Sequence, residues 1–158
     1  MYNVKEKYEY IFQTYGEKLY RSVLFMCKNV QDSEDITQNT FLKLYTTETV
    51  FETELHVKNW IYKIALNEVK NLKKSKWFQR KSIEEVEQVI MPKEQLGLYH
   101  TLMKLSDSYR VVIILYYYEG YSIREIASIL DKKVSTIQTQ LQRGRKKLKL
   151  YLESEKDE

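Results

Sequence analysis

An all-α fold is predicted by the sequence: two small helical domains joined by a linker, the C-terminal one carrying a helix-turn-helix. Gly and Pro number 4 and 1 among 158 residues, so the chain has few of the tight turns that a β-rich fold needs. Apolar side chains recur at helical spacing through most of the chain. The exception is a polar stretch of mixed charge that contains Pro92. We therefore place the domains at 1–76 and 96–158 and the linker at 77–95, with a short helix expected near 83–89.

Three helices are expected in the first domain. The first has an apolar stripe near a 3.6-residue period and a candidate break at Gly16. The second opens on a run of acids at 32–35, where carboxylates favour the positive end of a helix dipole. An aperiodic loop separates it from the third helix, which is rich in apolar residues around Trp60. The helices are expected at 4–29, 32–45 and 58–74, and the loop at 46–56.

Two short helices joined by a tight polar turn are the most specific pattern in the second domain. Ser122 and Glu125 have the spacing of a capping box, in which hydroxyl and carboxylate each satisfy a backbone N–H. Ser135 and Gln138 repeat that spacing at the start of the second helix. This is a helix-turn-helix pattern, and such units place their second helix in the major groove of DNA. Upstream of it, the periodicity predicts helices at 96–104 and 107–118.

Basic residues are concentrated in two places, although the net charge is only +4. One patch lies at 70–81, and neither it nor the second patch contains an acid. The second patch follows the helix-turn-helix and holds Arg143, Arg145, Lys146, Lys147 and Lys149. Two separated basic patches predict two contacts with one polyanion, typical of a DNA-binding protein. The alternative is an ordinary helical hairpin whose cations balance the negative end of a helix dipole.

Several other classes are disfavoured. No apolar run approaches the ~20 residues that span a bilayer, and the first residues lack a secretory signal, so we expect a cytoplasmic protein without membrane insertion. The single cysteine, Cys27, excludes an internal disulfide and a Cys-based metal cluster. Asp32, Glu34 and Asp35 could be metal ligands of a nuclease, but adjacent acids at a helix start usually serve the dipole. We expect no cofactor, no metal and no enzymatic activity.

Three segments of the chain resemble, in order, conserved regions of bacterial RNA polymerase sigma factors of the extracytoplasmic-function (ECF) type. They are DSEDITQNTFLKLY at 32–45, VKNWIYKIALNEVKNLKK at 57–74, and the segment 105–148 that contains the helix-turn-helix. The resemblance implies an alternative sigma factor that binds core RNA polymerase and directs promoter-specific transcription initiation. The first domain would bind the polymerase clamp and open the minus-ten element. The second would sit on the polymerase flap and read the minus-35 element.

The same resemblance implies the partners and the site residues. The partners are core RNA polymerase, double-stranded promoter DNA, its melted non-template strand and, in many such proteins, an anti-sigma factor. The loop at 46–56 would form the pocket for an extruded base. The residues implied for polymerase binding are Asp32, Asp35, Gln38, Asn39 and Leu42. Those implied for the minus-ten element are Asn67, Lys70, Asn71 and Lys74. Those implied for the minus-35 element are Ser135, Thr136, Gln138, Thr139, Gln140, Arg143, Arg145, Lys146 and Lys147.

Departures from the family pattern bear on which promoter is read. Relatives often carry basic residues where Gln138 and Gln140 stand. Because Gln can bond adenine at N6 and N7 together, these residues predict adenines in the upstream element. Trp60 is expected in the core, in preference to stacking on a base. Two alternatives stay open: a helix-turn-helix regulator that acts without core polymerase, and a metal-dependent nuclease built on the acidic run.

Overall fold

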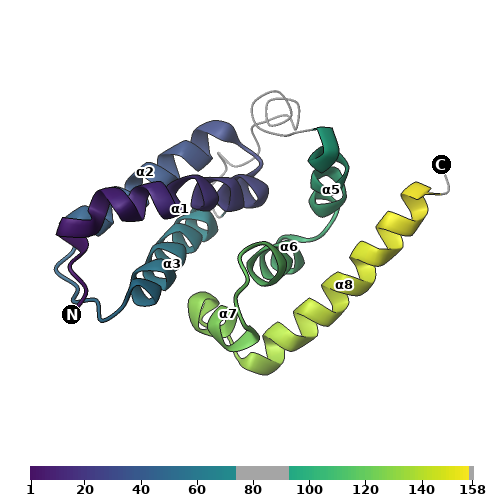
Figure 1. Ribbon diagram of the computed structural model, residues 1–158. Coiled ribbons are helices and arrows are strands. Elements are labelled where there is room, and N and C mark those ends of the chain that lie inside the picture. Colours follow the sequence, from purple (N-terminus) through teal and green to yellow (C-terminus); the bar gives the residue numbers. More distant parts are fainter. Residues whose placement is uncertain (74–92, 157–158) are drawn as a thin grey trace. The chain divides into compact units, whose positions relative to one another are not determined.

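The computed structural model describes residues 1–73 and 93–156, which belong to two compact units, Met1–Val86 and Glu87–Glu158 (Figure 1). Regular structure in the described residues is helical apart from one antiparallel bridge between Tyr2 and Phe51. The expected all-α fold with two helical domains is confirmed. Most of the expected linker, including its short helix near 83–89, lies outside the described residues.

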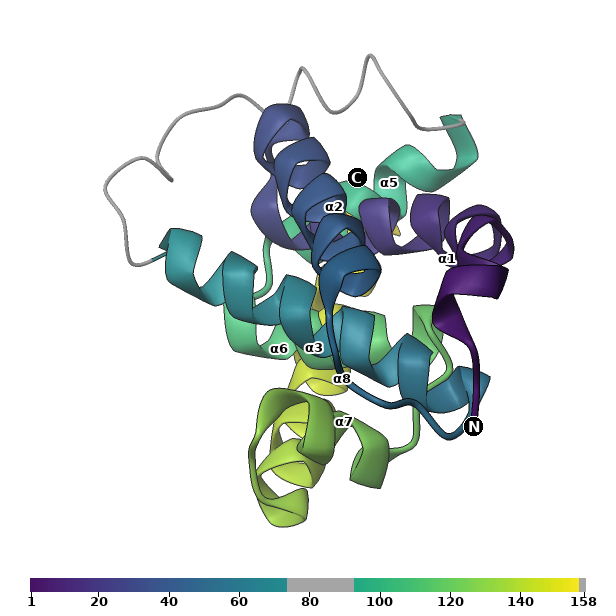
Figure 2. The ribbon, with the colours of Figure 1, turned by 90° about the vertical axis from the view of Figure 1, so that its left-hand side faces the viewer.

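In its described residues, 1–73, unit 1 is a bundle of three helices, α1 (Val4–Cys27), α2 (Val30–Thr46) and α3 (Glu54–Lys73). Helix α1 packs along α2, and both contact α3 (Figures 1 and 2). The apolar stripes of all three helices meet in the core. Its fully buried side chains include Ile11, Leu19, Met26, Phe41, Leu44, Ile61 and Ala65.

Helix boundaries in unit 1 differ from the sequence prediction for local reasons. Helix α1 runs through Gly16 without a break, and the Phe12 ring lies 3.8 Å from an ideal Cβ at that position. Helix α2 begins before its acids, because Asn29 is the N-cap and its side chain accepts from the Asp32 N–H at 2.8 Å. Helix α3 begins at Glu54, four residues before the expected start.

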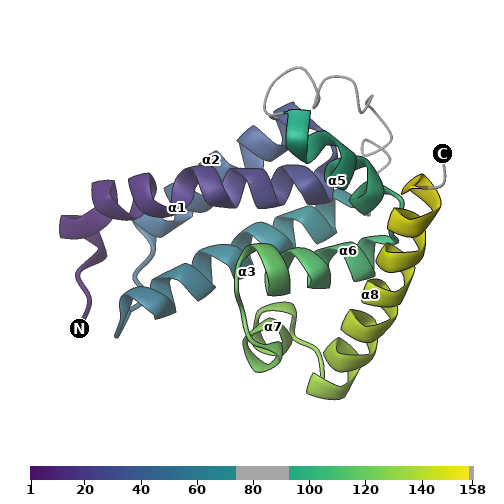
Figure 3. The ribbon, with the colours of Figure 1, turned by 45° about the vertical axis from the view of Figure 1, so that its right-hand side comes forward.

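Unit 2 contains α5 (Lys93–Met103), α6 (Asp107–Ile113), a π-helical turn η2 (Ile114–Tyr118), α7 (Ile123–Leu130) and α8 (Val134–Lys156). The long helix α8 contacts α5, α6 and α7, and Figure 3 shows α6 and α7 against its length. Helix α5 begins inside the stretch that we assigned to the linker.

The helix-turn-helix of unit 2 is built from α7 and α8. The capping box at Ser122 and Glu125 is confirmed, with both hydrogen bonds at 3.1 Å. Helix α7 ends at Leu130, and its C-cap is Asp131, a non-glycine residue at φ 54°. The Asp131 N–H donates to the Ser128 carbonyl at 3.4 Å, and the Lys132 N–H donates to the Ala127 carbonyl at 2.9 Å. This paired closure is the Schellman type of helix end.

The prediction of a second capping box at Ser135 and Gln138 is wrong. Helix α8 begins at Val134, and its first turn is closed by the bond from Ile137 N–H to the Lys133 carbonyl. Ser135 therefore lies inside the helix, where its carbonyl accepts from the Thr139 hydroxyl at 3.0 Å. The turn after Asp131 is so short that α8 begins before the serine.

The packing of α8 on α6 and the start of α6 depend on two separate features. A Cβ at Gly144 would lie 3.3 Å from Ile113 and 3.4 Å from Tyr109, so the absence of a side chain permits this approach. Arg110 of α6 is fully buried, and its guanidinium donates to the Leu105 carbonyl at 3.0 Å. A buried charge needs such partners, which fix the start of α6 beneath α8.

Candidate nucleic-acid interface

Helix α2 presents one exposed polar face. Ile36, Thr40, Phe41 and Leu44 turn inward, so helical spacing places Gln38, Asn39 and Leu42 outward. Leu42 exposes 61% of its surface, a large value for an apolar side chain. Asp35 accepts from Gln31 Nε2 at 3.0 Å on the same face. The structure thus brings together four of the five residues expected to bind polymerase, namely Asp35, Gln38, Asn39 and Leu42, whereas Asp32 lies half-buried in the first turn.

Helix α3 presents a second exposed face. Asn67, Lys70 and Asn71 are exposed, while Ile61, Ala65 and Val69 of the same helix face the core. Lys74, expected to join them, lies outside the described residues. Sequence reasoning missed Lys63, which is exposed and lies one turn before Asn67. Its i, i+4 spacing to Asn67 was the signal that could have found it.

Trp60 and Tyr62 differ in exposure although only one residue separates them. Tyr62 is 1% exposed and belongs to the core. Trp60 is half-buried, and its indole meets the Phe51 ring edge to face, with centroids 5.6 Å apart. Trp60 therefore packs against the loop before α3, and part of its indole stays exposed to solvent.

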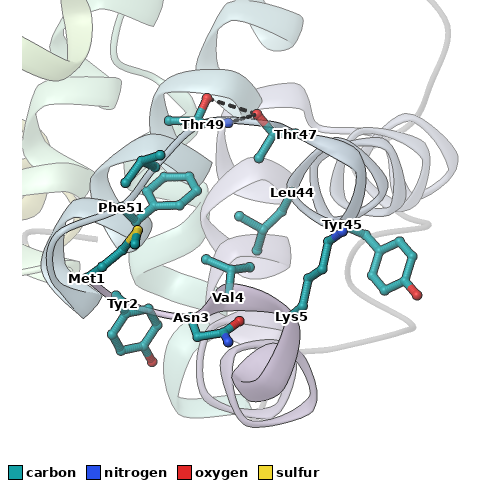
Figure 4. A pocket seen from close by; sticks show the side chains of 11 residues that line it. Met1, Tyr2, Asn3, Val4, Lys5, Leu44, Tyr45, Thr47, Thr49 and Phe51 are labelled. Carbon is teal, nitrogen blue, oxygen red and sulfur yellow. Dashed lines mark hydrogen bonds between the residues drawn. The ribbon is translucent and has the colours of Figure 1, made fainter.

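That loop, between α2 and α3, borders an open pocket of about 400 Å³. Thr47 and Thr49 bond to each other on one side of it, and Phe51 is buried beneath. Residues far away in sequence form another side, as Figure 4 shows for Tyr2, Asn3 and Lys5. The pocket thus combines apolar surface with hydroxyl, amide and ammonium groups.

A carboxylate at the start of α3 links the first residues of the chain to α1. Glu54 accepts from the Tyr15 hydroxyl at 2.9 Å and from the Tyr2 hydroxyl at 3.3 Å. Burial alone would raise the pKa of Glu54, but hydrogen bonds from Tyr15, Tyr10 and Tyr2 outweigh it and lower that pKa below its usual value. Burial, together with the hydrogen bond to Glu54, raises the pKa of Tyr15.

Helix α8 turns Ile137, Leu141 and Gly144 toward the core and leaves a polar face outside. The outermost stripe follows helical spacing opposite those residues. It consists of Ser135, Thr139, Gln142 and Lys146, all exposed. Sequence reasoning missed Gln142, although it lies one turn after Gln138 and Thr139 and the spacing could have revealed it.

Gln138 and Gln140 lie on opposite flanks of that stripe, because two residues turn a helix by about 200°. Gln138 is exposed. Gln140 is half-buried, and its Oε1 is buried without a hydrogen-bond partner. With Thr136 and Arg143 it borders an open polar cleft of about 430 Å³, whose other side carries Ser108 of α6.

The cations of α8 likewise lie on the outermost stripe and on its two flanks. The Arg145 guanidinium lies over the Tyr116 and Tyr117 rings, at 5.6 and 5.8 Å. Lys147 lies on the other flank, over the Tyr109 ring at 5.3 Å. Lys146 stays on the outermost stripe. Cation–π contacts orient Arg145 and Lys147 along the two flanks of the helix.

The described residues bear on the nuclease alternative and on membrane insertion. Within residues 1–73 and 93–156, no three His, Cys, Asp or Glu side chains come together in a group suited to a metal ion. In that same part of the chain, no helix is both long and apolar enough to cross a membrane.

Comparison with known proteins gives two family matches and several relatives. Sigma-70 region 2 matches residues 11–79, and sigma-70 region 4 matches residues 95–148. ECF RNA polymerase sigma factor SigW of Bacillus subtilis is 30% identical over 90% of this chain and 87% of its own length. SigM of the same organism is 29% identical over 94% of this chain and 97% of its own length.

Solved structures share the fold. The sigma factor RpoE of Bartonella quintana, in complex with the anti-sigma factor NepR, superposes with a TM-score of 0.76 at 19% identity, covering 94% of this chain and 98% of that one. CnrH, in complex with the cytosolic domain of CnrY, superposes with a TM-score of 0.71 at 23% identity, covering 92% and 87%.

The relatives match nearly the whole chain, and the two family models fall in order on its two parts. These findings favour a polymerase-dependent factor over a regulator that acts alone and over a nuclease. The chain belongs to the ECF family of RNA polymerase sigma factors, and it binds core RNA polymerase and directs promoter-specific transcription initiation.

Proposed function

We propose that three exposed helix faces divide the work of initiation. The α2 face docks on the polymerase clamp, the α3 face with the preceding loop holds the melted minus-ten element, and α8 reads the minus-35 element while unit 2 sits on the flap. The observation that carries this division is that each of these helices buries one face and exposes a polar one. The polymerase supplies the chemistry, so the sigma chain itself needs no catalytic group, and it works in the cytoplasm.

The α2 face suits a protein partner. It combines one carboxylate, two amides and an exposed Leu42. Interfaces of this composition gain area from the apolar side chain and orientation from the polar groups around it. Asp32, at the edge of this face, would contribute through its charge.

The α3 face and the loop pocket suit single-stranded DNA. Asn67 and Asn71 offer amide donors and acceptors for base edges, and Lys63 and Lys70 offer charge for the backbone. Extruding a base costs a few kcal/mol of stacking, so the protein must replace it with edge hydrogen bonds and stacking. The pocket formed by the α2–α3 loop and the first residues of the chain would take the extruded base.

The α8 stripe suits the major groove of duplex DNA. Thr139 and Gln142 lie at the outermost position, with Gln138 beside them. Gln138 would bond an adenine, whereas Lys146 would hold a phosphate. Arg145 and Lys147 would reach the backbones on either side. Ser135 and Thr136 would contact the DNA near the start of the helix, and Arg143 would read a guanine or hold a phosphate from the cleft beside Gln140.

Run-off transcription with core polymerase on a genomic library tests the division. The wild-type chain should yield discrete start sites that share two upstream elements. Asp35→Arg combined with Gln38→Ala should weaken core binding and transcription together, while far-UV circular dichroism and duplex binding by the free chain stay unchanged. Lys18→Ala in α1 is a control outside the three faces. Equal core affinity of the double variant and wild type would remove the α2 assignment.

We also propose regulation by an anti-sigma protein. RpoE, which shares this fold, was solved with the anti-sigma factor NepR. Exposed aromatic side chains in unit 1, among them Tyr10, Phe12 and Tyr45 at 50%, 50% and 54% exposure, offer apolar area for such a partner. Co-purification of the tagged chain from its own cells should recover a partner that blocks run-off transcription. Full activity without any such partner would contradict the proposal.

A further inference from the structure

The pocket beside the α2–α3 loop is built partly from residues that precede α1. Tyr2, Asn3 and Lys5 line it on one side, and Tyr45 and Thr47 line it on the other (Figure 4). Some 40 residues of chain separate the two sides. Neither side alone makes a concave surface, so the pocket exists only while the two segments stay together.

Two kinds of bond hold them together. The Tyr2 N–H donates to the Phe51 carbonyl at 2.7 Å, which pairs the first segment with the loop. The Glu54 carboxylate then accepts from Tyr2 and from Tyr15, one residue on each side of the start of α1. Lys7 lies 4.8 Å from the centre of the Tyr2 ring and adds a cation–π contact. We call this set, Tyr2, Tyr15, Phe51 and Glu54, the loop latch.

The loop latch acts on a segment with little other support. Residues 47–53 have no helix or strand beyond the single bridge at Phe51, and several of them are exposed. Loop backbones of this kind sample several shapes unless side chains fix them. Phe51 is buried at 2% exposure and carries Trp60 on its ring, so fixing Phe51 also fixes Trp60.

We infer that residues 2–5 are a working part of the single-strand site: they form one wall of the pocket for the extruded base, the loop latch sets the pocket's shape, and Lys5 contacts the phosphate beside that base. Lys5 is exposed and lines the pocket together with Tyr45 and the buried Phe51. An ammonium group at the rim of a stacking pocket is the usual arrangement for single strands, in which charge tracks the backbone and an aromatic ring meets the base. Glu54 is a positioning residue in this scheme, because it acts through the loop.

This inference rests on the proposed role of the loop pocket, and the experiment separates the two. Holoenzyme is mixed with a single-stranded oligonucleotide that carries the non-template minus-ten sequence of a promoter found by run-off transcription. The oligonucleotide contains 2-aminopurine at the extruded position, whose fluorescence reports unstacking. Binding is measured over a range of salt concentrations for wild type, Lys5→Ala, Glu54→Ala, Glu54→Gln and Asn67→Ala.

Lys5→Ala should lower the affinity several-fold at low salt and reduce the salt slope by about 0.7, the value for one phosphate contact on a single strand. Lys43→Ala removes the same charge from unit 1 outside the pocket and should leave the slope unchanged. Glu54→Ala should lower the fluorescence change several-fold and speed hydrogen exchange in residues 47–53. Glu54→Gln, which keeps an acceptor, should restore most of both signals. Glu17→Ala on the surface of α1 is the matched control.

Two other results would be decisive. If Lys5→Ala and Glu54→Ala bind and extrude like their controls while Asn67→Ala loses binding, the inference is wrong and the proposed α3 site stands. If Asn67→Ala also behaves like wild type, the proposed site itself is wrong and the inference is wrong with it. Circular dichroism of each variant checks folding, and exposed Lys5 gives a variant whose fold should not change.

Discussion

The two units hold their functional surfaces by different means. In unit 2 the surface is helix α8, and local contacts begin both helices of the helix-turn-helix: Ser122 and Glu125, three residues apart, cap α7, and the Ile137 N–H bonds the Lys133 carbonyl, four residues back, at the start of α8. In unit 1 the pocket depends on Tyr2 and Glu54, which are 52 residues apart, and on Tyr15, 39 residues from Glu54. A surface made by short-range bonds forms with its own helix, whereas a surface made by long-range bonds needs the whole bundle.

Both units depend on a packed core, so the largest expected loss of stability comes from removing a core side chain. Leu141→Ala removes a fully buried side chain from α8 and should cost about 2–5 kcal/mol of unfolding free energy, since it leaves a cavity. Leu150→Ala, on the same helix but 57% exposed, should change it by no more than about 0.5 kcal/mol. Urea unfolding measures both. Similar losses in the two variants would show that α8 is not anchored at Leu141.

The next largest effect concerns which side chains of α8 read bases of the upstream element. Gln138→Ala should cost ~1–3 kcal/mol at one base pair of the upstream element and relax the preference for adenine there. Gln140→Ala should leave the preference unchanged, because that side chain is half-buried with its Oε1 buried. Lys146→Ala should weaken all sequences alike and lower the salt slope by about 0.9. A binding selection with each variant compares them, and loss of an adenine with Gln140→Ala would reverse the assignment of the two flanks.

A smaller effect is expected when a local contact of unit 2, the cap of α7, is removed. Ser122→Ala removes the α7 cap and should cost about 1 kcal/mol. The loss should appear as weaker duplex binding by unit 2, with single-strand binding by the holoenzyme unchanged. Ser128→Ala, at an exposed position inside α7, is the control. If Ser122→Ala disturbed the minus-ten signal equally, the contrast between local and long-range support would not hold.

The smallest effect concerns how the stability of unit 1 depends on pH through Glu54, which bonds residues far away in sequence. The pKa of Glu54 is lowered in the folded chain, so its ionised form stabilises the fold above its ordinary pKa near 4.5. This stabilisation should be lost as the pH falls through the lower, folded-state pKa. Glu54→Gln, which cannot ionise, should therefore be less stable than wild type at pH 7 to 8, and the two stability profiles should converge at acid pH. Unfolding midpoints between pH 3 and 8 measure it, and identical profiles would mean that the hydrogen bonds from Tyr2 and Tyr15 contribute nothing.

The sequence by itself determined the all-α class, the helix-turn-helix with its first capping box, and the family. These follow from periodic apolar residues and from pairs three or four residues apart, whose geometry any helix imposes. The exposed faces at Gln38 and Asn67 could be predicted for the same reason. The polymerase and promoter roles of individual side chains remain proposals.

Only the tertiary structure decided the rest. The Asn29 cap and the start of α8 at Val134 depend on how each turn closes, which single-residue patterns do not specify. Burial of one end of Gln140 depends on the approach of α6 at Gly144, and the loop latch depends on Tyr2 meeting Phe51 and Glu54. Such contacts join residues far apart in the chain, and no periodicity links their positions, so the packed core alone brings them together.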